Sequence, residues 1–226
     1  MKLKELMDRS RIIVALDFLN DKVLESMQKI MDYIAAVKIG IPTILSEHYH
    51  VLRDILKNRK TYVLVDFKLA DIPPIMSRVI EKLSPLANGF IAHAFVGKHA
   101  LENLRQSINR YNAELFLVVA MTHPGAEEFI NKNFMKFLEI ASDIADGVVA
   151  PATYPIYIRE ARKYLGDKII ISPGIGRQGV KYGEAIKNGA DFEIIGRSIT
   201  LSDDPIAEIQ RILAAHSDAL KEKDES

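Results

Sequence analysis

Short apolar segments recur along the chain, and longer stretches separate them in which apolar positions repeat every three or four residues. The short segments are rich in β-branched residues and apolar almost throughout, as is typical of parallel strands buried on both faces. They lie at residues 11–17, 34–39, 61–66, 89–93, 115–121, 147–150, 168–172 and 192–196. The stretches between them, such as residues 21–32 and 42–57, have the periodicity of amphipathic helices.

Strands and helices that alternate eight times within about 200 residues predict a (β/α)8 TIM barrel, an α/β fold in a single domain. An open, doubly wound sheet shares the alternation, but no Gly-x-Gly-x-x-Gly segment follows the first strand. We assign residues 1–215 to the barrel. Residues 216–226 are rich in charge and poor in apolar side chains, so we expect a frayed, charged C-terminal tail there.

Composition narrows the classes of protein to consider. The 226 residues include 30 basic and 30 acidic side chains, and this balance gives no reason to expect nucleic acid or an anionic membrane as a partner. Cysteine is absent, which excludes disulfides and thiolate chemistry and favours a cytoplasmic location. The first apolar segment is closed by Asp17 and is too short for a membrane span, so we expect a soluble protein.

Charged residues gather where the second and third strands end. Asp66 and Lys68 are two residues apart and should face the same way, with Asp71 in the following loop. Lys38 closes the second strand, and in a barrel the carboxyl ends of strands carry the active site. Any one pair would suit a structural ion network. Taken together, the lysines between the aspartates keep the neighbouring carboxylates ionised. They also place a proton donor where negative charge develops during a reaction, which suits a reaction that passes through a carbanion.

Glycine-rich loops follow the last two predicted strands, at residues 172–179 and 196–198. These are the two loops that commonly form a phosphate site in barrels. Glycines let backbone N–H groups approach an anion, and the Arg197 guanidinium offers paired donors. We therefore predict a phosphorylated ligand, and a lid formed by residues 173–183 that brings Gln178 to it.

Together these segments resemble the orotidine 5′-phosphate decarboxylases, in their short archaeal form, over nearly the full chain. The family's Asp-x-Lys-x-x-Asp-Ile-Pro hallmark spans residues 66–73 here. Similar segments occur in the family's order at residues 15–17, 37–40, 122–125, 172–174 and 196–198. The resemblance implies decarboxylation of orotidine 5′-phosphate to uridine 5′-phosphate in pyrimidine biosynthesis, with no cofactor and no metal.

The resemblance also implies a role for each matched residue. Lys68 would donate the proton to C6 of the pyrimidine, Asp66 would lie beside the substrate carboxylate, and Lys38 would order the charged groups and reach the ribose. A homodimer is implied, in which Asp71 and Ile72 enter the partner's site. The other substrate contacts would be Asp17 on a ribose hydroxyl, Thr122 on the pyrimidine edge, Gln178 and Arg197 on the phosphate, and Pro173, Gly174 and Gly196 beside them.

Two positions depart from the family pattern. Ile75 stands where a threonine is usual, and Glu193 interrupts the eighth strand where an aliphatic residue is expected. An ion pair of Glu193 with Arg197 low in the barrel, or a solvated position, would account for the second departure. His93 ends the fourth strand, and we expect it to hydrogen-bond a neighbour.

Two other functions remain open. A magnesium-dependent sugar-phosphate aldolase or decarboxylase of the same superfamily shares the Asp-x-Lys-x-x-Asp segment, but an acidic metal ligand would be expected where this chain has Lys38. A non-catalytic barrel that binds a phosphorylated ligand would need the glycine-rich loops, yet it would not need Lys68 between two aspartates.

Overall fold

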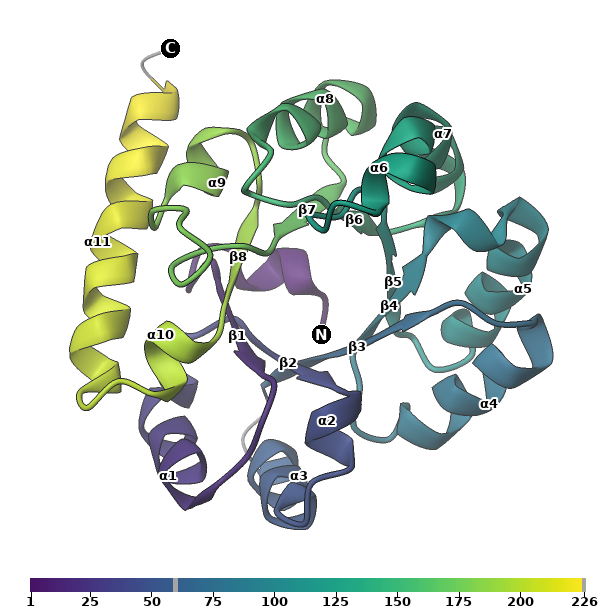
Figure 1. Cartoon of the computed structure of the whole chain (residues 1–226). Helices are drawn as coiled ribbons and strands as arrows, with labels where there is room; N and C mark the ends of the chain where they lie inside the picture. Colours follow the sequence, from purple (N-terminus) through teal and green to yellow (C-terminus); the bar gives the residue numbers. More distant parts are fainter. Residues whose placement is uncertain (59–60, 225–226) are drawn as a thin grey trace.

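Eight parallel strands close into a barrel in the computed structural model, which describes residues 1–58 and 61–224 (Figure 1). Each strand pairs with the next one along the chain, and pairing of β1 with β8 closes the ring. The strands are β1 (Ile12–Leu16), β2 (Ala36–Gly40), β3 (Tyr62–Leu69), β4 (Gly89–His93), β5 (Glu114–Val118), β6 (Gly147–Val149), β7 (Ile169–Ser172) and β8 (Phe192–Ile195). The predicted TIM barrel is confirmed.

Helices surround the barrel on its outer face. The α-helices are α1 (Asp21–Ile30), α2 (Ile41–Ile44), α3 (Tyr49–Asn58), α4 (Pro73–Leu83), α5 (Lys98–Asn109), α6 (Ala126–Phe129), α7 (Phe134–Ile144), α8 (Pro155–Leu165), α9 (Glu184–Lys187), α10 (Arg197–Thr200) and α11 (Pro205–Asp224). Short 3-10 helices are η1 (Leu3–Leu6), η2 (Met31–Tyr33), η3 (Ala94–Val96) and η4 (Asn131–Asn133). The single helix predicted over residues 42–57 is wrong, because α2 and α3 are separate helices.

The strands are apolar almost throughout because both faces of the barrel are buried. Alternate residues point inward and form the inner core, while the residues between them pack against the helices. The inward set includes Ile13, Ala15, Tyr62, Leu64, Ile91, Phe116, Val118, Val149, Ile169, Ile171, Phe192 and Ile194. The inner core leaves little open space in the barrel except at its ends.

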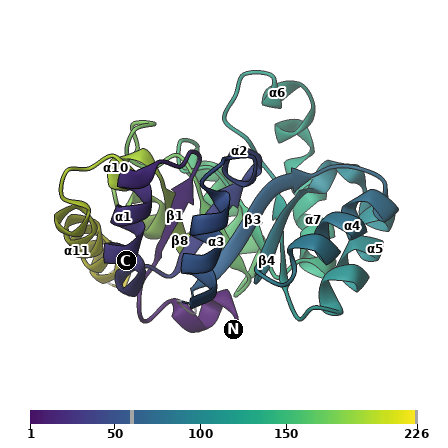
Figure 2. The same cartoon turned by 90° about the horizontal axis from the view of Figure 1, so that it is seen from below.

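The N-terminal segment closes one end of the barrel. Figure 2 shows η1 at the end opposite to α2, α6 and α10. Leu3 is fully buried, and its N–H donates to Glu114 Oε2 at 2.8 Å. The Tyr62 hydroxyl donates to the same oxygen at 2.8 Å, and burial raises the pKa of the Glu114 carboxyl. The carboxyl ends of the strands are therefore the end that stays open.

The C-terminal segment differs from the frayed tail expected for residues 216–226. Helix α11 continues to Asp224, and within it His216 and Ala219 are buried at 3% and 7% exposure. The charged residues that suggested a tail lie on the exposed positions of this helix, such as Lys221. Residues 225 and 226 lie outside the described residues.

Within the part of the chain that is described, no helix is both long enough and apolar enough to cross a membrane.

Candidate active site

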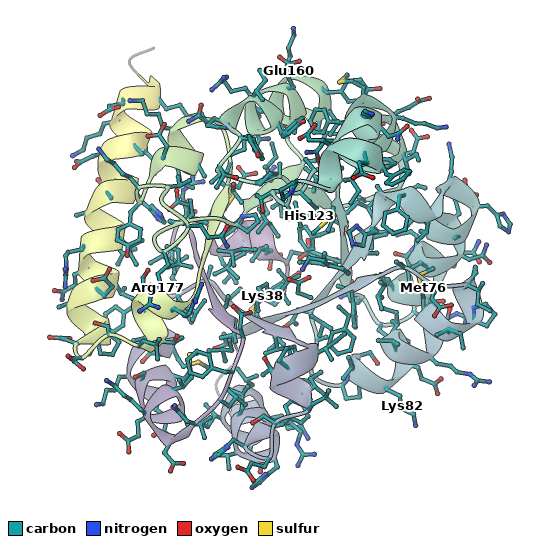
Figure 3. All side chains as sticks on the ribbon, viewed as in Figure 1. Lys38, Met76, Lys82, His123, Glu160 and Arg177 are labelled. Carbon is teal, nitrogen blue, oxygen red and sulfur yellow. The ribbon has the colours of Figure 1, made fainter. Side chains whose placement is uncertain are left out.

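A cavity of about 290 Å³ opens at the carboxyl ends of the strands. All but two of the predicted site residues line it: Asp17, Lys38, Asp66, Lys68, Thr122, Pro173, Gly174, Gln178, Gly196 and Arg197. Lys38 lies near the middle of the barrel in the view of Figure 3. Segments separated by up to 180 residues in sequence thus meet at one cavity, because the carboxyl ends of parallel strands share one end of the barrel.

Strand β3 carries an irregularity at the hallmark segment. Its pairing with β4 passes from Asp66–Ile91 directly to Leu69–Ala92, so Phe67 and Lys68 form a bulge. Lys68 has φ +46°, in the left-handed region that few residues other than glycine adopt. With this backbone, the Lys68 ammonium lies 3.0 Å from each carboxylate oxygen of Asp66. Strained residues of this kind persist where the surrounding structure fixes them, often at functional sites.

Four charged side chains alternate in sign along the cavity wall, and we call them the charged array: Asp17, Lys38, Asp66 and Lys68. Lys38 Nζ lies 3.1 Å from Asp66 Oδ2 and 3.3 Å from Asp17 Oδ1. Burial is greatest in the middle of the array, where the Lys38 and Asp66 side chains are 10% and 8% exposed. Lys68 and Asp17 at its two ends are 40% and 61% exposed. The array therefore runs from solvent into the barrel and back.

The buried carboxylate of Asp66 stays ionised because of its two lysine neighbours. Burial alone would raise the pKa of Asp66, but Lys38 and Lys68 outweigh burial and lower it below its ordinary value. An ionised carboxylate is thus held at the edge of a cavity, in surroundings where a second negative charge would be strongly repelled.

His93 ends β4 close to the charged array. Burial, with a smaller contribution from Lys68, lowers the pKa of His93 to about 4, so its ring is neutral at neutral pH. The ring lies 4.6 Å from that of Phe95, centroid to centroid. The expected hydrogen bond to a neighbour is not found at Nδ1, which is buried and has no partner among the described residues.

The two glycine-rich loops contact each other at the wall of the cavity formed by the ends of β7 and β8. Gly174 and Gly176 have φ of +104° and +75°, which their lack of a side chain permits. A Cβ on Gly176 would lie 2.5 Å from Ser198 Oγ, so the loop after β7 sits directly against the start of α10. Arg177 also lines the cavity, from the loop between β7 and α9 (Figure 3). The guanidiniums of Arg177 and Arg197 therefore lie at the same wall, a suitable place for a dianionic phosphate.

The wall near Thr122 is fixed by a buried asparagine. The Asn131 side chain accepts from the Met121 N–H at 3.0 Å and donates to the Met121 carbonyl at 3.1 Å. Met121 and Thr122 both line the cavity. The apolar part of the lining comes from Ala15, Ile91, Val118, Ala120, Val149 and Ile194. This end of the cavity suits a flat ring that offers polar edges to Thr122.

Two residues that line or support the cavity, Arg177 and Asn131, are not among the site residues predicted from the sequence. Arg177 was overlooked although it lies beside Gln178 in the glycine-rich loop, where any cation is a candidate phosphate ligand. The role of Asn131 cannot be seen in the sequence. Its side chain binds the main chain of Met121, and any residue at that position has the same main-chain groups. The suggested pairing of Glu193 with Arg197 is wrong: Glu193 lies on the outer face of β8 and contacts His216.

Asp71 and Ile72 are the two predicted site residues that do not reach the cavity of their own chain. Both are exposed, Ile72 at 62%, and Asp71 Oδ1 accepts the Ile72 N–H at 2.7 Å. Within the described residues, no three or more histidine and acidic side chains are grouped as metal ligands would be.

Known proteins share this arrangement of sequence and fold. Residues 10–212 match the sequence model of the orotidine 5′-phosphate decarboxylase / HUMPS family. The chain is 43% identical over 193 residues to the orotidine 5′-phosphate decarboxylase of Sulfurisphaera tokodaii, covering 84% of this chain and 88% of the relative. It is 34% identical over 215 residues to that of Methanococcoides burtonii, covering 90% and 96%.

Solved structures agree with the sequence relatives. The crystal structure of orotidine 5′-monophosphate decarboxylase from Sulfolobus solfataricus superimposes with a TM-score of 0.85 at 33% identity, covering 93% of this chain and 99% of that one. The enzyme from Methanocaldococcus jannaschii, complexed with the inhibitor BMP, gives a TM-score of 0.84 at 30% identity, covering 92% and 98%.

The lowered pKa of His93 predicts a pH dependence of stability. Because the folded protein binds the His93 proton less tightly than the unfolded chain, the free energy of unfolding falls as pH drops from about 6.5 to about 4. One such group contributes at most about 1.4 kcal/mol per pH unit. In His93→Gln this part of the slope is lost, whereas the exposed control His99→Gln keeps it. Urea unfolding at a series of pH values measures both, and equal slopes for His93→Gln and wild type would contradict the assignment.

Proposed function

The chain belongs to the orotidine 5′-phosphate decarboxylase / HUMPS family, and we propose that it converts orotidine 5′-phosphate to uridine 5′-phosphate and carbon dioxide, a step of pyrimidine biosynthesis. The charged array carries this proposal, because it sets an ionised Asp66 and the ammonium of Lys68 3.0 Å apart at the wall of a cavity. The reaction needs no metal and no cofactor. Relatives named orotidine 5′-phosphate decarboxylase support the choice of substrate.

The cavity accommodates the three parts of such a substrate. Gln178, Arg177 and Arg197 take the phosphate at the glycine-rich loops, with the backbones of Pro173, Gly174 and Gly196 beside it. Asp17 and Lys38 bind the ribose hydroxyls. The pyrimidine lies against the apolar wall with its polar edge at Thr122, which directs its carboxylate to the charged array.

The chemical step follows from the order of charges in the array. Asp66 repels the substrate carboxylate: two such groups about 3.5 Å apart repel by roughly 5 kcal/mol at an effective dielectric constant near 20. When the bond from C6 to the carboxyl carbon breaks, carbon dioxide leaves uncharged and the electron pair stays on C6. The Lys68 ammonium stabilises that pair and then donates a proton to C6, so the repulsion at Asp66 is relieved as the favourable charge contact forms.

Binding energy from the phosphate assists this step. The glycine-rich loops hold the phosphate away from Asp66 and Lys68, and contacts there pull the carboxylate toward Asp66 against the repulsion. Closure of the loop at residues 173–183 over the phosphate would exclude water from the array and strengthen each charge interaction.

The two rival functions fit the site less well. For a magnesium-dependent enzyme, the space between Asp17 and Asp66 would have to receive a cation, and Lys38 Nζ already lies 3.3 Å and 3.1 Å from their oxygens. For a barrel that only binds a phosphorylated ligand, the strained Lys68 would have no purpose.

The site is completed across a homodimer in this proposal. Asp71 and Ile72 are exposed in the single chain and lie outside its cavity, where a partner's cavity would receive them. Large apolar side chains are exposed on the segments that follow β2 to β5, as an interface requires. They are Ile41, Leu45, Ile72, Ile75, Phe95 and Phe129. Ile75, in place of the usual threonine, would add an apolar contact there. A cytoplasmic location stays a prediction from composition.

Removal of the proton donor tests the proposed reaction. Wild type should consume orotidine 5′-phosphate in the presence of a chelator, measured as loss of its ultraviolet absorbance. Lys68→Ala should lose at least about 10³-fold in kcat, since the general acid and the charge that stabilises C6 go together. The matched control Lys82→Ala, an exposed lysine on α4 (Figure 3), should keep full activity.

Two outcomes would contradict the proposed reaction. Wild type that binds uridine 5′-phosphate but does not turn over orotidine 5′-phosphate would favour the barrel that only binds a ligand. Activity that is abolished by the chelator would favour the magnesium-dependent enzyme.

Mixing two inactive variants tests the shared site. Asp71→Ala and Lys68→Ala homodimers are each expected to be nearly inactive, but a heterodimer contains one site with the Lys68 of one subunit and the Asp71 of the other. Random subunit exchange at equal concentrations should restore about one quarter of wild-type activity, because half of the dimers are mixed and each has one intact site. Full exchange, shown by native mass spectrometry, without recovery of activity would contradict the shared site.

A further inference from the structure

A carboxyl–imidazole pair lies buried outside the candidate active site, between the barrel and α11. The Glu193 side chain is 0% exposed and that of His216 is 4% exposed, with His216 Nε2 2.8 Å from Glu193 Oε2. A carboxylate at such a position is costly unless donors surround it. Two backbone donors complete the set: the Gly183 N–H lies 3.1 Å from Oε2 and the Ala185 N–H 3.0 Å from Oε1. Because the carboxylate only accepts, His216 Nε2 carries a proton.

The backbone donors lie where the loop that carries Arg177 and Gln178 ends, Gly183 as its last residue and Ala185 in the first turn of α9. This phosphate loop, residues 173–183, leaves β7 and ends at Gly183, directly before α9. Gly183 has φ +83°, and a Cβ there would lie 2.7 Å from the Ala215 carbonyl oxygen, so the loop end sits directly on α11. Figure 1 shows α11 beside α9 and α10. Glu193 therefore connects three segments: β8, the end of the phosphate loop, and α11.

A second contact ties the same end of the loop to α11. The Tyr182 hydroxyl donates to Glu208 Oε1 at 2.6 Å, and the Glu208 side chain is 12% exposed. By contrast, Arg177, Gln178 and Gly179 at the tip of the loop are exposed. The loop thus has a fixed base on α11 and a tip that is free to approach a ligand.

We propose that Glu193 and His216 are positioning residues for phosphate binding, acting through the backbone of Gly183 and Ala185 on the tip of the phosphate loop. The proposal rests on the proposed function, in which the cavity takes a 5′-phosphate. The buried carboxylate fixes where the loop returns to the barrel, and so fixes the reach of Arg177 and Gln178. Glu193 also lies on β8 three residues before Gly196, so one residue aligns both glycine-rich loops. An aliphatic side chain at this position could not bind the two N–H groups.

The two positioning residues contribute specifically to recognition of the phosphate group. Loss of their contacts leaves the charged array, Thr122 and the apolar wall in place. The affinity for a ligand without phosphate is therefore unaffected, and kcat at saturating substrate changes less than KM.

The test compares uridine 5′-phosphate with uridine as ligands, by calorimetric titration of the full-length protein. Glu193→Gln turns one acceptor oxygen into an amide that opposes the N–H donors, so the affinity for uridine 5′-phosphate should fall about tenfold while that for uridine stays within about twofold. Glu114→Gln is the matched control, because Glu114 is also a buried carboxylate with two donors but lies at the opposite end of the barrel. It should lower stability without changing the ratio of the two affinities.

Substitutions at His216 and Tyr182 provide independent readings if Glu193→Gln does not fold. His216→Gln keeps a donor toward Glu193 and should rescue the phosphate selectivity that His216→Phe loses. Tyr182→Phe removes the contact of the hydroxyl with Glu208, together with its contact with Ser198, and should give a smaller loss in the same direction.

The outcomes separate this inference from the proposed function. If wild type does not prefer uridine 5′-phosphate to uridine, the proposed function itself fails. If wild type shows the preference and turns over orotidine 5′-phosphate, but the Glu193, His216 and Tyr182 variants keep the wild-type ratio of affinities, the pair only stabilises the fold and the inference is overturned. A parallel loss of affinity for both ligands would overturn it equally.

Discussion

The ionised carboxylate of Asp66, held between Lys38 and Lys68, is the constraint on which the rest of this molecule depends. The Asp66 side chain is 8% exposed, and it stays ionised because the ammonium groups of Lys38, on β2, and Lys68, on β3, lie 3.1 Å and 3.0 Å from its oxygens. The strands must therefore end at the same height in the barrel. The left-handed backbone of Lys68 is the local cost of bringing the second ammonium to Asp66. The same geometry leaves Asp66 able to repel an incoming carboxylate.

The barrel around the charged array supplies a closed far end and a binding place for the phosphate. The 3-10 helix η1, with Leu3 fully buried, covers the far end of the barrel, and the inner core lies between it and the charged array. The glycine-rich loops after β7 and β8 line the same cavity as the array and add a phosphate contact that is remote from the reacting carbon. Helix α11 in turn fixes the base of one of these loops. Phosphate binding and the chemical step are thus assigned to different segments around one cavity, and Asp17 of the charged array lies beside Gly196, where the two meet.

The sequence predicts the fold well because a strand buried on both faces has an unmistakable composition. All eight strands lie where the apolar segments placed them, and polar residues at the ends of those segments mark the cavity. The predictions failed where structure depends on contacts between distant residues. Glu193 and His216 are 23 residues apart, and no motif connects them. The charges near residue 221 suggested a tail because composition does not reveal that the other side of the same helix packs on the barrel. The bulge at Lys68 arises from the pairing of two strands, which one strand's sequence does not specify.

The most direct measurement of the central claim is the pKa of the Asp66 carboxyl group, followed by its ¹³C chemical shift in an NMR titration of labelled protein. We expect a value below 3.8 in wild type, because the two lysines outweigh burial. In Lys38→Met the pKa of Asp66 should rise above that of wild type, because burial then acts against one fewer positive charge. A wild-type pKa at or above 3.8 would contradict the claim that the array holds Asp66 ionised against the substrate carboxylate.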